Sequence, residues 1–188
     1  LYGTNEIRTG ALECLARINR SGYTIDFLTA ALAQDSSAEE RSVGRKNLIA
    51  LEGGVPSEAS GRELLLINFR KAETEAESTK NDESQKVLWS VNESRTGVTH
   101  QPAQKIFAVY RDVADAAAQL RRLGGLSLDD ASDILAAEIG YRLMLDPDWG
   151  EPAQVKSVKS QYPILNDAAA LLQALEHAIN TNDLPAAV

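Results

Sequence analysis

The sequence predicts an all-α fold, a compact bundle of about six to eight helices. Two observations predict it: the chain is rich in Ala, Leu, Glu, Gln and Arg, which are strong helix formers, and its apolar residues recur at spacings of three and four. No segment repeats at a fixed period, which argues against a solenoid. With 188 residues we expect a single helical domain over residues 1–188, with a subdivision near 96–101 as the alternative.

The first helix is predicted over residues 5–20. Its inner face should be formed by the apolar residues that repeat at helical spacing, which are Ile7, Ala11, Leu15 and Ile18. Cys14 lies on or beside this face, and we expect it to be a small core residue rather than a nucleophile.

Helix-capping residues predict where the next two helices begin and end. Thr24 is the expected cap of the second helix, and Ser37 with Glu40 forms the capping box that starts the third. The pair Gly53-Gly54 should end this third helix, because glycine adopts the left-handed conformation at a helix C-terminus without strain.

Residues 62–92 allow two interpretations. A second capping box, Ser60 with Glu63, followed by helical spacing of apolar residues favours a long helix that breaks near residues 80–82. A second helix would then contain Val87, Leu88 and Val91. The alternative is a short β-hairpin around 62–92, because short apolar runs such as 64–67 and 87–89 also suit strands. We expect the polar run 74–84 to be a mobile segment.

The C-terminal half predicts three further helices. After a turn at 95–101, Pro102 should occupy the first position of a helix over 102–123, which Gly124-Gly125 ends. Ser127 should cap the next helix. The last helix is expected over 166–179, with its apolar face turned inward, consisting of Ala168, Leu171, Leu172, Leu175 and Ile179.

Composition argues against most catalytic and metal-binding chemistry. The chain has one cysteine and two histidines, His100 and His177, and no motif that spaces such residues for catalysis, zinc or phosphate binding. We therefore expect no cofactor and no metal, and favour a protein that is not an enzyme. The net charge of -8 and the lack of a long apolar run indicate an acidic cytoplasmic protein that does not bind membranes.

The positive charges gather in one region. Lys105, Arg111, Arg121 and Arg122 could form a basic stripe along the helix over 102–123, able to contact a nucleic-acid backbone or an acidic partner. Specific DNA reading is disfavoured, because the helix that would enter the groove begins with several acids. The acidic turn 146–151 lacks the ligand spacing of a calcium loop.

The predicted function is that of a non-catalytic helical protein–protein interaction module or a subunit of a larger assembly. Its partner would be another protein or the rest of a longer parent chain, because the sequence starts at Leu1 like a processed chain or a fragment. The helices 102–123 and 166–179 are the candidate docking surfaces. The alternative is a helical subunit of a nucleoprotein complex that uses the basic stripe. A third hypothesis is an enzyme that uses Cys14 or the turn 146–151.

Overall fold

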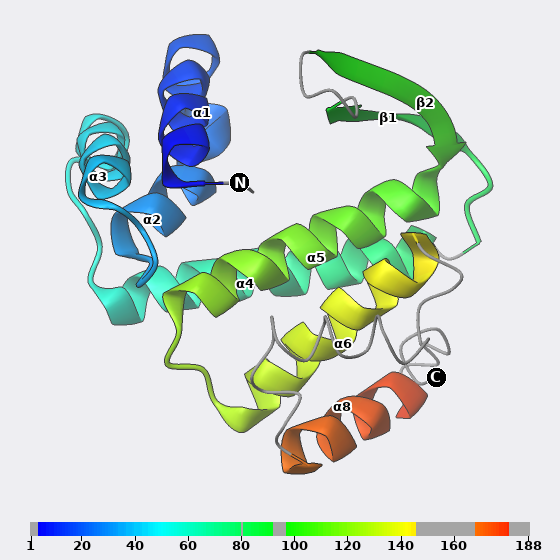
Figure 1. Cartoon of the computed structure of the whole chain (residues 1–188). Helices are drawn as coiled ribbons and strands as arrows, with labels where there is room; N and C mark the ends of the chain where they lie inside the picture. The colour runs from blue at the N-terminus through cyan, green and yellow to red at the C-terminus, as the bar shows by residue number, and fades with distance from the viewer. Residues whose placement is uncertain (1–3, 80, 92–96, 146–167, 181–188) are drawn as a thin grey trace. The chain divides into compact units, whose positions relative to one another are not determined.

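The computed structural model describes residues 4–79, 81–91, 97–145 and 168–180, and it confirms an all-α fold with a short β-hairpin (Figure 1). Within these ranges the elements are α1 (Asn5–Ile18), the 3₁₀ helix η1 (Arg20–Tyr23), α2 (Thr24–Leu32), α3 (Ala38–Glu52), α4 (Glu58–Thr79), β1 (Gln85–Val91), β2 (Val98–Gln104), α5 (Lys105–Leu123), α6 (Leu128–Leu145) and α8 (Ala168–Asn180).

The chain forms two compact units. The first consists of Leu1–Asn68 with Ala118–Leu126, and the second of Phe69–Ala117 with Ser127–Val188. The helices α4 and α5 therefore each contribute residues to both units. Among the described residues, no helix is both long and apolar enough to cross a membrane.

In the first unit α2 and α3 pack at close range, because Gly44 of α3 has no side chain. A Cβ atom placed there would lie 2.7 Å from the backbone nitrogen of Ala31 and 2.7 Å from the carbonyl oxygen of Phe27, both in α2. The core of this unit is formed by fully or almost fully buried apolar residues, which are Leu12, Phe27, Leu28, Ala30, Ala31, Ala33, Leu48, Leu65, Leu120 and Leu123.

Several helix ends follow the predicted capping chemistry. The Ser37 hydroxyl accepts a hydrogen bond from the backbone N–H of Glu40 at 3.1 Å, and Gly53 ends α3 with a φ of 76°. The start of α4 was predicted three residues late. Ser57, rather than Ser60, caps this helix, because its hydroxyl accepts from the backbone N–H of Ser60 at 3.2 Å.

The predicted inner face of α1 is wrong by about one residue of rotation. Arg8 and Leu12 are buried, whereas Ile7 is 54% and Ile18 is 77% exposed. Cys14, expected in the core, is exposed. The physical reason is an ion pair: the Arg8 guanidinium turns inward to a buried carboxylate, and α1 rotates with it.

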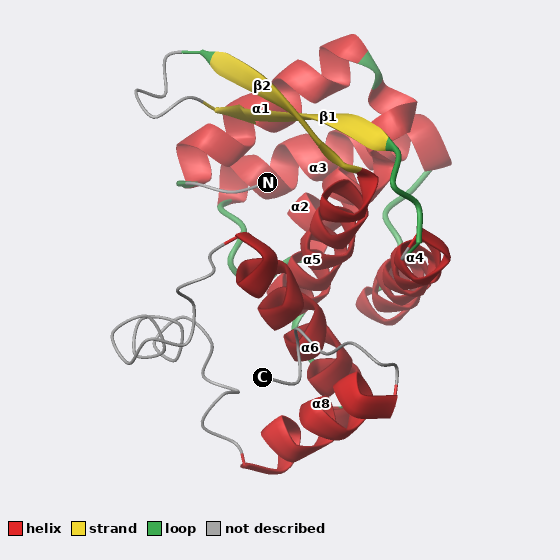
Figure 2. Cartoon of the chain, turned by 90° about the vertical axis from the view of Figure 1, so that its right-hand side faces the viewer, coloured by secondary structure: helices red, strands yellow, loops and turns green. Residues whose placement is uncertain are grey.

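In the second unit the segment after α4 forms strands where we predicted a helix and a turn. The antiparallel strands β1 and β2 pair Val87 with Pro102 and Trp89 with His100 (Figure 2). Pro102 therefore lies in a strand, and α5 begins at Lys105 instead. The hairpin also differs from the alternative around 62–92, because residues 62–79 belong to α4, including the first part of the polar run 74–84.

The helices α5, α6 and α8 complete the described chain. Gly124 and Gly125, with φ values of 72° and 65°, end α5 as predicted, and Ser127 caps α6 by accepting from the backbone N–H of Asp130 at 3.1 Å. The second core is built mainly from alanine. Its buried apolar residues are Phe69, Ala76, Ala108, Val109, Val113, Ala114, Ala116, Ala117, Ile134, Leu135, Ala136 and Ala174.

Candidate interaction surfaces

The structure places two of the predicted basic residues, Lys105 and Arg111, in the second unit. Lys105 is the first residue of α5, and its ammonium lies 2.7 Å from the carboxylate of Asp82. The hydrogen bond from Lys105 holds the pKa of the Asp82 carboxyl well below its usual range. Arg111 donates to the carbonyl oxygen of Trp89 at 3.4 Å, next to the β-hairpin. Both cations thus contact residues of their own unit.

The other two basic residues, Arg121 and Arg122, lie in the last turn of α5 and belong to the first unit. Arg121 is exposed. Arg122 points into the protein: its side chain is only 13% exposed and its Nη2 lies 2.7 Å from Glu40. The four cations therefore do not share one environment, and Arg121 is the exposed member of this pair.

A buried carboxylate, Glu40, organises the first unit. Its side chain has no exposed surface, and its two oxygens accept from Arg8 Nε at 3.2 Å and from Arg122 Nη2 at 2.7 Å. Asp35, which is 52% exposed, accepts from Arg122 Nε at 2.9 Å. Burial raises the pKa of Glu40, but the hydrogen bonds from both arginines outweigh it and leave the pKa lowered.

Sequence reasoning missed this cluster, which we call the Glu40 cluster (Arg8, Asp35, Glu40 and Arg122). The sequence predicts that Glu40 completes a capping box with Ser37. In the structure the backbone N–H of Glu40 takes part in this cap, but its side chain does not. The partners of its side chain lie in α1 and α5, far away in the sequence, so no local spacing of residues predicts them. Since Glu40 is inaccessible to solvent, the cluster holds helices in place and offers a substrate no access to its carboxylate.

A hollow with a clear lining lies in each unit. In the second unit a space of about 280 Å³ is lined by Tyr110, Val113 and the ion-paired Arg70, whose guanidinium contacts Glu73 at 2.9 Å and Asp133 at 2.5 Å. In the first unit a space of about 470 Å³ has a mainly apolar lining, which includes Ile25, Leu28, Leu48, Val55, Pro56 and Leu64. The hollow of the second unit thus contains an arginine that is ion-paired to two acids of its own lining, whereas Glu52 is the charged residue in the lining of the hollow of the first unit.

The outer face of α8 is apolar and exposed. Leu172, Leu175 and Ile179, predicted to be buried, are 57%, 39% and 59% exposed. The inner side of α8 packs on α6: Ala174 is buried, and Gln173 lies within hydrogen-bonding distance of the first turn of α6. The prediction of an inward face was wrong for these three residues because the apolar face of α8 is wider than the side that packs on α6.

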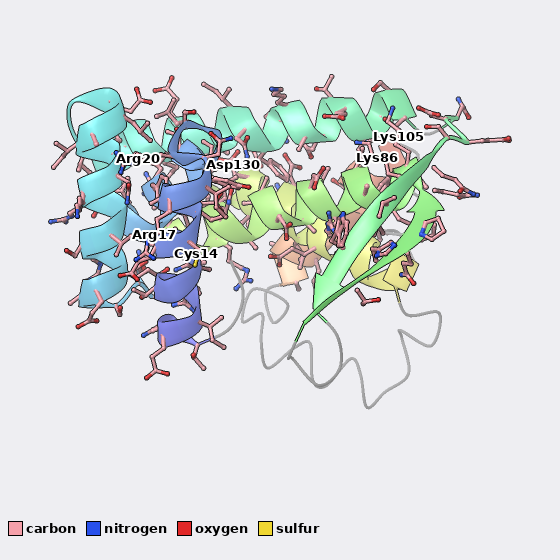
Figure 3. All side chains as sticks on the ribbon, turned by 90° about the horizontal axis from the view of Figure 1, so that it is seen from above. Cys14, Arg17, Arg20, Lys86, Lys105 and Asp130 are labelled. Atoms are coloured by element: carbon pink, nitrogen blue, oxygen red, sulfur yellow. The ribbon has the colours of Figure 1, made fainter. Side chains whose placement is uncertain are left out.

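The outer face of α1 is a second exposed apolar stripe. It carries Ile7, Cys14 and Ile18, with the half-buried Ala11 between them, at spacings of four, three and four. Figure 3 shows Cys14 and Arg17 on this helix and Arg20 just after its end, in η1.

The remaining predicted groups do not form a reactive centre in the part of the chain that the structure describes. The His100 ring contacts the Trp89 ring, with centroids 4.8 Å apart. Within the described ranges no three His, Cys, Asp or Glu residues are grouped so that they could hold a metal ion. The turn 146–151 and the side chain of His177 lie outside the described residues.

Comparison with protein-family models, with curated proteins and with solved structures finds no match to this chain.

Proposed function

We propose that the chain is a non-catalytic helical interaction module that binds a partner protein, or another part of a longer parent chain, through the outer face of α8. The observation that carries the proposal is the exposure of Leu172, Leu175 and Ile179 on a helix whose opposite side is already packed on α6. In the described chain the apolar face of α8 extends beyond the side that packs on α6, and an exposed apolar patch of this kind is typical of a binding surface.

The spacing of these three residues fits a helical partner. Positions 172, 175 and 179 are three and four residues apart, which is the spacing of side chains that enter the groove of a facing helix. The C-terminal part of the sequence, which contains α8, is acidic: from Gly125 to Val188 it has three Lys and Arg residues and ten acids. The partner that fits is therefore an amphipathic helix with leucines at this spacing and Lys or Arg at the flanks of its apolar face.

The other predicted docking helix, α5, supports the proposal less well. Its strongest apolar positions, among them Val109, Val113 and Leu120, are buried. Docking through this face would require the protein to open, whereas the outer face of α8 is accessible as it stands. The outer face of α8 is therefore the surface that we propose for binding.

A synthetic helical peptide tests the proposal directly. We expect a peptide with leucines at the stated spacing and flanking lysines to bind the full chain in isothermal titration calorimetry, with an affinity in roughly the micromolar range. Leu172→Glu with Ile179→Glu should abolish binding, because both side chains would be desolvated against the peptide. Ile67→Glu, which replaces another exposed isoleucine, is the matched control and should leave binding unchanged.

Two results would contradict this function. One is the absence of binding to the wild-type chain. The other is binding that survives the double substitution in α8. A peptide with flanking glutamates should bind more weakly than the lysine peptide, which separates a specific acidic surround from general hydrophobic association.

The alternative, a helical subunit of a nucleoprotein complex, is favoured by one observation. Trp89 is 59% exposed, contacts His100, and lies beside Arg111, a combination of aromatic ring and cation that suits single-stranded nucleic acid. Binding of a single-stranded oligonucleotide should then weaken steeply with salt and be reduced by Arg111→Glu, which reverses the charge beside Trp89. Salt-insensitive peptide binding together with no oligonucleotide binding would reject this alternative.

A further inference from the structure

The exposed stripe of α1 has the spacing of a helix-pairing seam. Ile7, Ala11, Cys14 and Ile18 are separated by four, three and four residues, which is the heptad spacing that lets two helices pack along a common line. Ile7 is 54% and Ile18 is 77% exposed, so the stripe is uncovered at both ends. The side of α1 that bears Arg8 and Leu12 packs inside the first unit, and this stripe lies on another side of the helix, exposed among the described residues.

The charges beside the stripe are divided along the helix. The first turn carries Glu6, the last turn carries Arg17, and Arg20 follows in η1, all of them exposed, while Glu13 lies between the two ends of the helix. A helix with an acid at one end and a cation at the other complements itself when a second copy lies antiparallel to it. In a parallel arrangement each charge would meet its like.

From this spacing and charge division we infer that α1 pairs with α1 of a second copy of the chain, antiparallel and about a two-fold axis. The seam then places Ile7 against Ile18 of the other copy, and Cys14 against Ala11. Glu6 of each copy lies near Arg17 of the other, and Glu13, close to the axis, lies near Glu13 of the other copy. This interface is isologous, as a closed dimer requires.

The interface is small, and this sets the expected affinity. A helix of 14 residues is about 21 Å long, so the seam spans roughly three to four turns. Contacts of this size belong to the weak and transient class of interfaces. The dimer should therefore form in roughly the range of tens to hundreds of micromolar.

Sedimentation equilibrium of the full chain over this concentration range tests the inference. Wild-type protein should shift reversibly from monomer to dimer. Ile18→Glu should keep the chain monomeric, while Ile49→Glu, at an exposed isoleucine on α3 that is 56% exposed, should dimerise like the wild type. A chain that stays monomeric throughout, or a dimer that withstands Ile18→Glu, overturns the inference.

Cysteine pairing tests the antiparallel register. Ala11→Cys places a thiol opposite Cys14 of the other copy, so mild oxidation should give a disulfide between positions 11 and 14 of two chains, identified by mass spectrometry of the linked peptides. A dominant link between the two Cys14 residues would indicate a parallel pair and overturn the proposed register. The inference does not depend on α8, because Ile18→Glu should leave binding of the helical peptide at Leu172 unchanged.

Discussion

Neutralising Glu40 should destabilise the first unit far more than neutralising the neighbouring Asp35. In Glu40→Gln, the charges of Arg8 and Arg122 remain within a few ångströms of an uncharged amide, although their side chains are only 10% and 13% exposed. Asp35 is 52% exposed and therefore compensates only part of the positive charge of the two arginines. Removing one partner of a buried ion pair costs about 3–5 kcal/mol, and we expect about 3 kcal/mol because the arginines retain some solvent contact.

Urea unfolding followed by circular dichroism measures this loss. With a urea dependence of about 2 kcal/mol per molar, the midpoint should fall by about 1–2 M. Amide hydrogen exchange of peptides from α1 and α3 then assigns the loss to the first unit. The matched control is Asp35→Asn, which removes a half-exposed carboxylate and should cost about 0–1 kcal/mol.

The pH dependence follows from the lowered pKa of Glu40. A carboxyl with a lowered pKa contributes its stability above the unfolded-state value, here ordinarily 4.5, and loses it as the pH falls through the folded-state value. The difference in the free energy of unfolding between wild type and Glu40→Gln should therefore be largest at pH 7 and become smaller as the pH falls below 4.5. A loss under about 1 kcal/mol at pH 7, or an equal loss in Asp35→Asn, would refute the reasoning.

A triple substitution separates the cost of burying the three charges from the cost of leaving two of them without their partner. Replacing Arg8 and Arg122 by Met together with Glu40 by Leu removes all three charges at once, so no buried charge is left without a partner. Such replacements are often neutral or stabilising. We expect this variant to regain most of the stability that Glu40→Gln loses.

Three further predictions concern single positions. Gly44→Ala should cost about 1–3 kcal/mol in urea unfolding, since its Cβ atom would collide with the α2 backbone, whereas Gly10→Ala, with no atom within 4 Å, should stabilise α1 by about 0.5–1 kcal/mol. Lys105→Met should raise the pKa of Asp82 toward its ordinary value, as measured by NMR titration of the carboxyl carbon; an unchanged pKa would show that Lys105 is not its cause. Ser127→Ala should destabilise α6 by about 1 kcal/mol through loss of its cap, and full protection of the first α6 amides in hydrogen exchange would contradict this.

The features that could be predicted from the sequence are those fixed by local chemistry. Ser37 and Ser127 cap helices because each hydroxyl accepts from a backbone N–H only three residues further along the chain. Gly53 and Gly124 end helices because glycine itself adopts the left-handed conformation without strain. The fold class followed for the same reason, since helical spacing is itself a local property.

The features that were mispredicted depend on distant partners. The face of α1 is set by Arg8, whose partner Glu40 lies 32 residues away. The hairpin is decided by the pairing of Trp89 with His100, while the apolar run around Trp89 suits a helix or a strand equally well. The exposure of Leu172 could not be read from composition, because apolar residues on both sides of a helix do not indicate which side the chain covers.

The position of Arg122 has a consequence for the order in which the protein can fold. Glu40 finds its first partner, Arg8, within the first 40 residues, but its second partner lies 82 residues further along the chain. During synthesis from the N-terminus, the Glu40 carboxylate can pair with Arg8 but not with Arg122 until the intervening chain has been made. The first unit also lacks Leu120 and Leu123 of its core until then. A chain stopped at residue 117 should therefore leave this unit unfinished, although all of α1, α2 and α3 has been synthesised.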